Sequence, residues 1–228
     1  MKWPWKIATG VLATLVASGC SHRARQGEAL NYELSFDVAQ SGSRKSYSQI
    51  VSVTPSQTYN YGTGWKGWGG LGCRVTGSAI PIEVDGGTLF ATLKRSIGTE
   101  PEGDQCRFLA EYFNIPNGDE TGAWVKAWDA IASSDRHFPL AKDHLPLFLF
   151  IPDETGWLGA RTLRPGQLSS LGVEIEKVEM TITRLPATIA PQSREANAAF
   201  WRLDSKQKRA MPSEVIEGLK GLIAEARA

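Results

Sequence analysis

The fold is decided by residues 32–53, which read YELSFDVAQSGSRKSYSQIVSV. On each side of a polar turn at residues 41–44, apolar side chains alternate with polar ones. The alternating apolar residues are Tyr32, Leu34, Phe36 and Val38 before the turn, and Tyr47, Val51 and Val53 after it. Alternation of period two is typical of a strand with one buried and one solvated face, and a short Ser-Gly-Ser turn joins two such strands. The stretch therefore predicts an antiparallel hairpin in a sheet with one wet face.

Three further stretches carry strand patterns. Residues 80–93 predict a second hairpin, whose tight turn is Asp-Gly-Gly at 85–87. Residues 147–151 form a short apolar run between two prolines, which is typical of a strand or a buried extended segment. Residues 173–182 alternate in two phases that residues 176–177 separate, and a slip of one residue turns every later side chain to the other face. We therefore expect a β-bulge there if the strand is continuous.

Helical spacing occurs in the middle of the chain and at its end. Two mid-chain apolar stripes recur at helical intervals: Cys106, Leu109, Ala110 and Phe113, then Trp124, Trp128, Ile131 and Ala132. Asp104 is placed to cap the first of these helices. Two more helices are predicted near residues 194–204 and 213–226, and the second is expected to pack on its own domain. The whole pattern predicts an α+β fold: an antiparallel sheet of about five to seven strands, with helices inserted mid-chain and at the C-terminus.

The N-terminal residues have the layout of an export signal. Lys2 and Lys6 form a short basic start, residues 7–17 form an apolar run, and small residues lead into Cys20. The apolar run is shorter than the roughly 20 residues that cross a bilayer, so it is interpreted as a signal and not as a permanent span. Its end resembles the bacterial lipobox, although Ala17 stands where leucine is usual. This resemblance implies cleavage before Cys20 and attachment of a lipid to its sulfur.

A lipid on Cys20 fixes the expected organisation of the chain. Residues 1–19 are expected to be a signal peptide, residues 20–29 a lipidated tether, and residues 30–228 a single α+β domain. Ser21 follows the cysteine, and a non-aspartate there resembles the outer-membrane sorting pattern of enterobacteria. We therefore expect an anchor in the outer membrane facing the periplasm, with the inner membrane as the alternative. An ordinary secretory signal with a chance cysteine is the other interpretation.

Charge and cysteine content fit an exported protein. Removing residues 1–19 takes away two lysines and no acidic residue, so 23 basic and 24 acidic residues remain. This balance provides no strong field for nucleic acid or anionic lipid. With Cys20 lipidated, Cys73 and Cys106 remain. An oxidising compartment favours a disulfide between them, and two buried free thiols are the alternative.

The least usual stretch is residues 59–72, where six glycines surround Trp65 and Trp68. The first three of these glycines match G-x-G-x-x-G, but the dinucleotide motif opens a helix, whereas here a strand follows. We therefore expect no nucleotide and no cofactor. The two tryptophans are candidates for contact with a protein partner, because aromatic residues dominate the energetics of interfaces. The alternative is that both indoles fold back over the open end of the sheet.

Four residues in one short segment are candidates for a metal site or an acid–base pair: Asp135, His137, Asp143 and His144. Their spacing matches no ligand motif, so the sequence favours the interpretation that all four are ordinary polar residues of a loop. Neither G-x-S-x-G nor H-E-x-x-H occurs in the chain, and the acidic residues near 100–104 are explained by the start of a helix. The sequence therefore predicts no catalytic residue, no metal site and no enzymatic activity.

The first half of the chain resembles a diffuse group of proteobacterial envelope proteins. The resemblance rests on a glycine-containing hairpin and on a later strand–turn–strand unit. The matching residues are Gly42, Ser46, Ser48 and Val51 in the hairpin, and Gly77, Ala79, Ile82, Val84, Gly86, Gly87, Leu89, Phe90, Ala91 and Leu93 in the later unit. Within this group, similarity to lipoprotein immunity proteins of type VI secretion lipase effectors implies a protein that binds and blocks a toxin arriving in the periplasm. No contact residue is transferred on this basis.

We therefore expect a periplasm-facing lipoprotein that acts by binding a protein. In its sharpest form, the hypothesis is an immunity protein that neutralises a toxic secreted effector. The alternative is an envelope assembly or structural lipoprotein of the outer membrane. The expected partners are the membrane, through the N-terminal lipid, and either a toxic effector or an envelope component. Nucleic acid is not expected as a partner.

Overall fold

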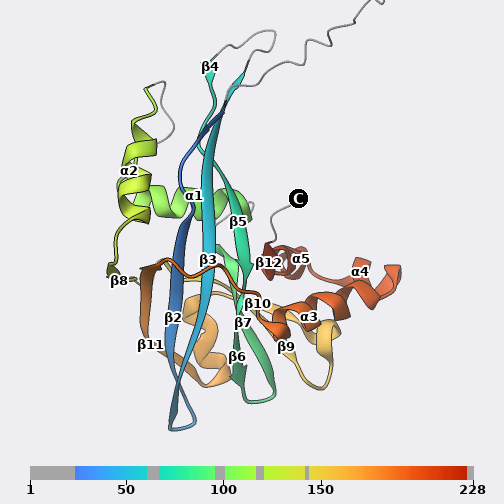
Figure 1. Ribbon diagram of the computed structural model, residues 1–228. Coiled ribbons are helices and arrows are strands. Elements are labelled where there is room, and N and C mark those ends of the chain that lie inside the picture. The colour runs from blue at the N-terminus through green and yellow to red at the C-terminus, as the bar shows by residue number, and fades with distance from the viewer. Residues whose placement is uncertain (1–23, 61–66, 96–100, 117–120, 142–143, 225–228) are drawn as a thin grey trace, which may run out of the picture.

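The computed structural model describes residues 24–60, 67–95, 101–116, 121–141 and 144–224 (Figure 1). The large sheet contains β1 (Ala24–Gln26), β2 (Leu30–Gln40), β3 (Ser43–Asn60), β4 (Gly67–Trp68), β5 (Gly72–Ser78), β8 (His137–Pro139), β11 (Val173–Thr183) and β12 (Ile223–Ala224). The small sheet contains β6 (Ile80–Val84), β7 (Gly87–Arg95), β9 (Pro146–Pro152) and β10 (Arg161–Leu163). The helices are α1 (Pro101–Tyr112), α2 (Ala123–Ala132), α3 (Pro191–Arg202), α4 (Ser205–Ala210) and α5 (Ser213–Lys220), with short 3₁₀ segments η2 (Gly156–Gly159) and η3 (Pro165–Leu171).

The predicted α+β class is confirmed, with antiparallel strands and with helices mid-chain and at the C-terminus. In the large sheet the strand order is β12-β5-β3-β2-β11-β8, with β1 and β4 as short additions to β3. In the small sheet the order is β10-β9-β7-β6. The strands are thus divided between two sheets. Strands of two or three residues, such as β12 and β10, are too short to give an alternating pattern in the sequence.

The predicted first hairpin is the pair β2–β3. Its register places Gln40 opposite Ser43, so Ser41 and Gly42 alone form the turn. Both turn residues have a positive φ, of 49° and 79°. Turns of this kind match the twist of two paired strands. The turn lies at the bottom of the view in Figure 1.

The predicted bulge is also found. β11 pairs with β2 on both sides of a register shift between Ile175 and Lys177, which leaves Glu176 as the extra residue. Val173 before the shift and Val178 after it are both buried. The bulge therefore lets both halves of the strand bury their apolar side chains on one face.

The core lies in three regions between layers. In the upper part of Figure 1, α1 and α2 cover the large sheet, and there Trp124 and Trp128 are fully buried. In the lower part the small sheet packs on the large one, with Phe36 against Phe148. The other face of the small sheet is covered by α3, α5 and η2. The small sheet is therefore buried on both faces, which explains why residues 147–151 are apolar without alternation.

The structure joins Cys73 and Cys106 in a disulfide, with the two Cα atoms 5.4 Å apart. The bond fastens α1 to β5, a strand that was not predicted because its residues show no alternation. Asp104, the predicted cap, instead lies inside α1, because the helix begins at Pro101. Proline suits a first helical position, since its fixed φ fits the helix and its missing N–H would be unpaired there in any case.

The last helix is shorter than predicted. α5 ends at Lys220, and the chain turns at Gly221 into the extended segment that contains β12. There the Leu93 N–H donates to the Gly221 C=O, and the Ala79 N–H donates to the Leu222 C=O, both at 2.8 Å. Backbone bonds to the strands therefore replace the bonds of a longer helix, while Leu222 is still fully buried.

The folded domain begins earlier than residue 30. Ala24–Gln26, expected to belong to the tether, form β1 and pair with residues 56–58 of β3. The Gly27 N–H then donates to the Pro55 C=O at 3.1 Å. Residues 1–23, with the expected signal and Cys20, lie outside the described residues. Residues 24–26 of the expected tether are therefore part of the large sheet.

Candidate binding groove at the open edge of β3

β3 extends beyond the strand that pairs with it on one side. β5 pairs with residues 52–56 of β3 and then leaves the large sheet, and the chain continues as β6. Gly77 permits this departure, because its φ is +147° and a Cβ there would lie 3.3 Å from the Val51 Cα. In the part of the chain that the structure describes, no strand pairs with residues 43–51 on this side. One edge of β3 is therefore open at the place where the two sheets separate (Figure 1).

The register identifies the backbone groups at this edge. The residues that flank a two-residue turn exchange both hydrogen bonds, so the odd-numbered residues of β3 point their N–H and C=O groups toward β2. The even-numbered Arg44, Ser46 and Ser48 point theirs to the open edge. Ile50 also points its backbone groups to this edge, and its C=O accepts a hydrogen bond from the Thr188 N–H at 3.1 Å. Three residues thus offer a donor and an acceptor each to an incoming strand.

A groove of about 550 Å³ lies along this edge. It is bounded by β3, by β6 and by residues 188–192, which lead into α3. Hydroxyl and amide side chains make up about half of its lining, among them Ser46, Ser48, Gln49, Thr88, Thr188 and Gln192. A second hollow of about 190 Å³ reaches the turn of the β2–β3 hairpin and shares Tyr47 and Glu83 with the first. Together the two hollows extend along the open strand.

The facing edge of β6 is less suited to pairing. Pro81 has no backbone N–H, so it cannot donate to an added strand. The Glu83 C=O accepts a hydrogen bond from the Tyr47 hydroxyl at 3.4 Å. An extended chain in the groove would therefore pair with β3.

Charged side chains around the groove are paired within the protein. Lys45 Nζ lies 3.4 Å from Glu83 Oε2, and Arg44 Nη2 lies 2.8 Å from Glu176 Oε1. Exposed pairs of this kind contribute little to stability. The charged side chains beside the groove therefore present no block of one sign.

The segment of residues 188–192 is held in place before any partner binds. Figure 1 shows the chain after β11 crossing in front of β2 and β3 to reach α3. The buried Gln49 side chain donates to the Thr188 C=O and to its Oγ1, the latter at 2.6 Å. The Ala190 N–H donates to the buried Ser78 Oγ at 2.9 Å. This side of the groove is therefore preorganised, which lowers the entropic cost of binding.

Trp68, one of the two candidate tryptophans, does not line the groove. Trp65 lies outside the described residues. Trp68 is half-buried in β4, with the Arg25 guanidinium 3.9 Å from its ring centroid and the Tyr59 ring in edge contact at 5.3 Å. The contacts of Trp68 are thus internal, in agreement with the alternative that the indole folds back over the sheet.

The two histidines of the candidate acid–base segment have different surroundings. His137 is exposed, and its Nδ1 lies 2.9 Å from Thr181 Oγ1. The His144 ring packs edge-on against the Tyr112 ring, with centroids 5.5 Å apart. Asp143 lies outside the described residues. Among those residues, no group of three or more potential metal ligands is found.

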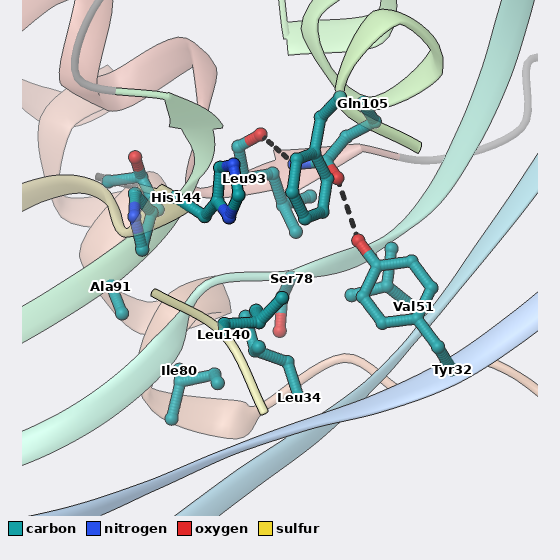
Figure 2. Close-up of a pocket in the computed structure, with 13 residues that line it drawn as sticks. Tyr32, Leu34, Val51, Ser78, Ile80, Ala91, Leu93, Gln105, Leu140 and His144 are labelled. Atoms are coloured by element: carbon teal, nitrogen blue, oxygen red, sulfur yellow. Dashed lines mark hydrogen bonds between the residues drawn. The ribbon is translucent and has the colours of Figure 1, made fainter. Parts of the chain in front are cut away.

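A small cavity of about 30 Å³ lies between the two sheets and α1 (Figure 2). In it the Tyr32 hydroxyl donates to Gln105 Oε1 at 2.7 Å, and the Gln105 amide donates to the Leu93 C=O. Burial raises the pKa of Tyr32, so its hydroxyl stays protonated and remains a donor. The cavity holds about one water-sized molecule and belongs to the core.

Comparisons with protein-family models, with curated proteins and with solved structures find no match for this chain. Within the described residues, no helix has the length and apolar character needed to cross a membrane. Sequence reasoning did not find the groove, because the open edge depends on where β5 leaves the sheet. The signal for that departure is a single residue, Gly77, in a stretch without strand alternation.

Proposed function

We propose that this protein binds an extended segment of a protein partner, which adds as a strand to the open edge of β3. The observation that supports this most strongly is the row of unpaired backbone groups of Arg44, Ser46 and Ser48 beside a groove of about 550 Å³. An added strand gains affinity from main-chain hydrogen bonds and specificity from alternate side chains that enter the groove.

The proposed setting is the periplasmic face of the outer membrane, with a lipid on Cys20. The layout of residues 1–20 supports export and lipidation. The disulfide between Cys73 and Cys106 suits an oxidising compartment. The resemblance to type VI immunity proteins supports the sharper form, in which the partner is a toxic secreted effector.

Strand addition provides a way to neutralise an effector without any enzymatic activity. A loop of the effector that becomes ordered along β3 is withdrawn from the effector's own active site. The preformed side of the groove at residues 188–192 helps to hold such a loop, because Gln49 and Ser78 already fix that segment.

The test is the variant Ser46→Pro. Proline at this position removes an N–H that faces the open edge and leaves the hydrogen bonds between β3 and β2 intact, a placement that edge strands tolerate. The partner is first captured with the wild-type protein from its own cells, and affinities are then measured by calorimetry. We expect the association constant for the partner to fall about tenfold or more. The lost hydrogen bond and the clash of the proline ring with the added strand each weaken binding by roughly 1 kcal/mol.

Ser46→Ala is the matched control, since it removes only the hydroxyl that donates to Asp37 at 2.6 Å. It should bind as the wild type does. Wild-type affinity in Ser46→Pro would remove the support for strand addition.

The identity of the captured partner separates the two functional classes. A stable complex with a secreted toxin supports immunity, whereas recovery with an outer-membrane machine supports the alternative of envelope assembly. Deletion of the gene should also sensitise cells to toxin-armed siblings. Healthy deletion cells in that competition would end the immunity hypothesis.

A further inference from the structure

The end of α3 and the whole of α4 form a surface that the groove does not use. Figure 1 shows both helices extending to the right of the body. α4 has no buried residue. Trp201, near the end of α3, is 64% exposed, although tryptophan is usually well buried. An exposed indole thus stands beside a short helix that is held outside the core.

This surface, residues 201–210, forms the basic arm. Its charged residues are Arg202, Lys206, Lys208 and Arg209 against the single acidic Asp204. The Asp204 carboxylate is occupied as the cap of α4, where it accepts hydrogen bonds from two backbone N–H groups at 2.8 Å. No salt bridge joins Arg202, Lys206 or Arg209 to another described residue. The arm therefore carries a local excess of positive charge.

Lys208 of α4 contacts the end of α3. Lys208 Nζ donates to the Trp201 C=O at 3.0 Å and lies 5.2 Å from the centre of the Trp201 ring. The ammonium group thus holds the end of α3 and places a cation beside the exposed indole. The arm presents aromatic and basic side chains together in a defined arrangement.

We propose that the basic arm binds the surface of a membrane that contains anionic phospholipids. Lysine and arginine are attracted to anionic headgroups, and the tryptophan ring prefers the headgroup level of a bilayer. Because the arm protrudes, it contacts a flat surface before the rest of the protein does. An acidic protein partner would instead need a concave surface that fits the arm. The near-zero net charge of the chain conceals this cluster, because acidic residues elsewhere in the sequence balance it. The inference is independent of the proposed function of the groove.

The test is co-sedimentation with vesicles. The chain from residue 20 onward, which contains every described element, is prepared with Cys20→Ser so that no lipid is attached. It is mixed with vesicles of phosphatidylglycerol and phosphatidylcholine, and with vesicles of phosphatidylcholine alone. We expect binding only to the anionic vesicles, and we expect added salt to weaken it.

Charge reversal identifies the arm as the contact. Lys206→Glu combined with Arg209→Glu should lower the partition coefficient about tenfold or more, because each basic residue near an anionic surface contributes roughly fivefold. Lys126→Glu combined with Arg136→Glu is the control, since it makes the same charge change at exposed residues outside the arm. Circular dichroism checks that both variants are folded.

The indole is tested in the same way. Trp201→Ala should weaken binding, whereas Leu185→Ala, which removes a side chain that is 61% exposed, should not. Equal binding to neutral vesicles, or wild-type binding by the charge-reversed arm, overturns the proposal. Failure to bind vesicles together with retention on immobilised polyglutamate also overturns it and points to an acidic protein.

Discussion

Gln57 connects three parts of the upper end of the molecule. Its side chain is 1% exposed. Its Oε1 accepts hydrogen bonds from the Trp124 indole at 2.9 Å and from the Arg25 guanidinium at 3.4 Å, and its amide donates to the Gly69 C=O at 2.7 Å. One side chain therefore fixes β1, α2 and the segment after β4 relative to β3.

The variant Gln57→Leu tests this role. It leaves the buried Trp124 N–H without this acceptor, so we expect the free energy of unfolding to fall by about 2 kcal/mol. Urea denaturation provides the measurement. The losses of stability caused by Gln57→Leu and by Trp124→Phe should be less than additive in the double variant, because the unpaired indole donor is absent there. Equal urea midpoints for Gln57→Leu and the wild type would contradict the role.

Lys94 is a buried cation with one carboxylate partner in α5. Its side chain is 5% exposed, and Nζ bonds to Glu217 Oε2. Glu217 also pairs with Lys220 Nζ at 2.9 Å. The hydrogen bond from Lys94, followed by that from Lys220, lowers the pKa of Glu217 below its ordinary value of 4.5. The pair therefore links α5 to β7 in a way that depends on pH.

The sign of this dependence follows from the direction of the shift. Because the pKa of Glu217 is lower in the folded state, its contribution to stability is complete above pH 4.5 and is lost as the pH falls through the folded pKa. Glu217→Gln should therefore reduce the fall in urea midpoint on acidification from neutral pH. Glu214→Gln, an exposed position in the same helix, should retain the full fall. An unchanged profile in Glu217→Gln would show that other carboxylates govern acid stability.

Which residues of β3 point their backbone groups toward β2, and which toward the open edge, can be tested without any partner. Tyr47 lies opposite Phe36 in β2, and its N–H points into the hairpin, whereas the Ser46 N–H points to the open edge. Tyr47→Pro should destabilise the protein by about 3 kcal/mol or more, because it removes a ladder bond inside the sheet. Ser46→Pro should cost much less. Thermal unfolding of the two variants gives the comparison, and equal losses would contradict the assigned phase.

Apart from β5, the longer strands of both sheets were predicted correctly, from alternation in the large sheet and from a turn signal and an apolar run in the small sheet. Alternation between residues 32 and 53 gave the first hairpin, and the phase change near Glu176 gave the bulge. The last helix was predicted too long, because Leu222 and Ile223 keep helical spacing although backbone bonds to strands hold them. Tertiary hydrogen bonds there outweigh a local pattern.

The candidate site was harder to predict than the fold. Cys73 and Cys106 were identified from compartment chemistry alone, and the structure joins them. Ser46 and Ser48 were noted only as positions of a resemblance, because two serines on a strand carry no chemical signal. Their importance arises from the edge that β5 leaves open, which is a property of the topology.

The disulfide connects distant parts of the protein, because it joins α1 to the large sheet across 33 residues of chain. Cys73→Ser combined with Cys106→Ser should lower the free energy of unfolding by about 3.5 kcal/mol, the loop-closure entropy of a bridge of this span. Calorimetry measures the shift in melting temperature. Reductant should shift the wild type equally and leave the double variant unchanged. A wild type insensitive to full reduction would show that packing alone holds α1.

The passage of one chain segment through both sheets has a consequence for their motions. β5 ends at Ser78 and β6 begins at Ile80, so Ala79 alone separates the large sheet from the small one. The Ala79 C=O also accepts a hydrogen bond from Ser193 Oγ at 3.0 Å. We therefore expect the two sheets to unfold together and not one at a time. The most protected amide protons of both sheets should then exchange with deuterium through the same unfolding event.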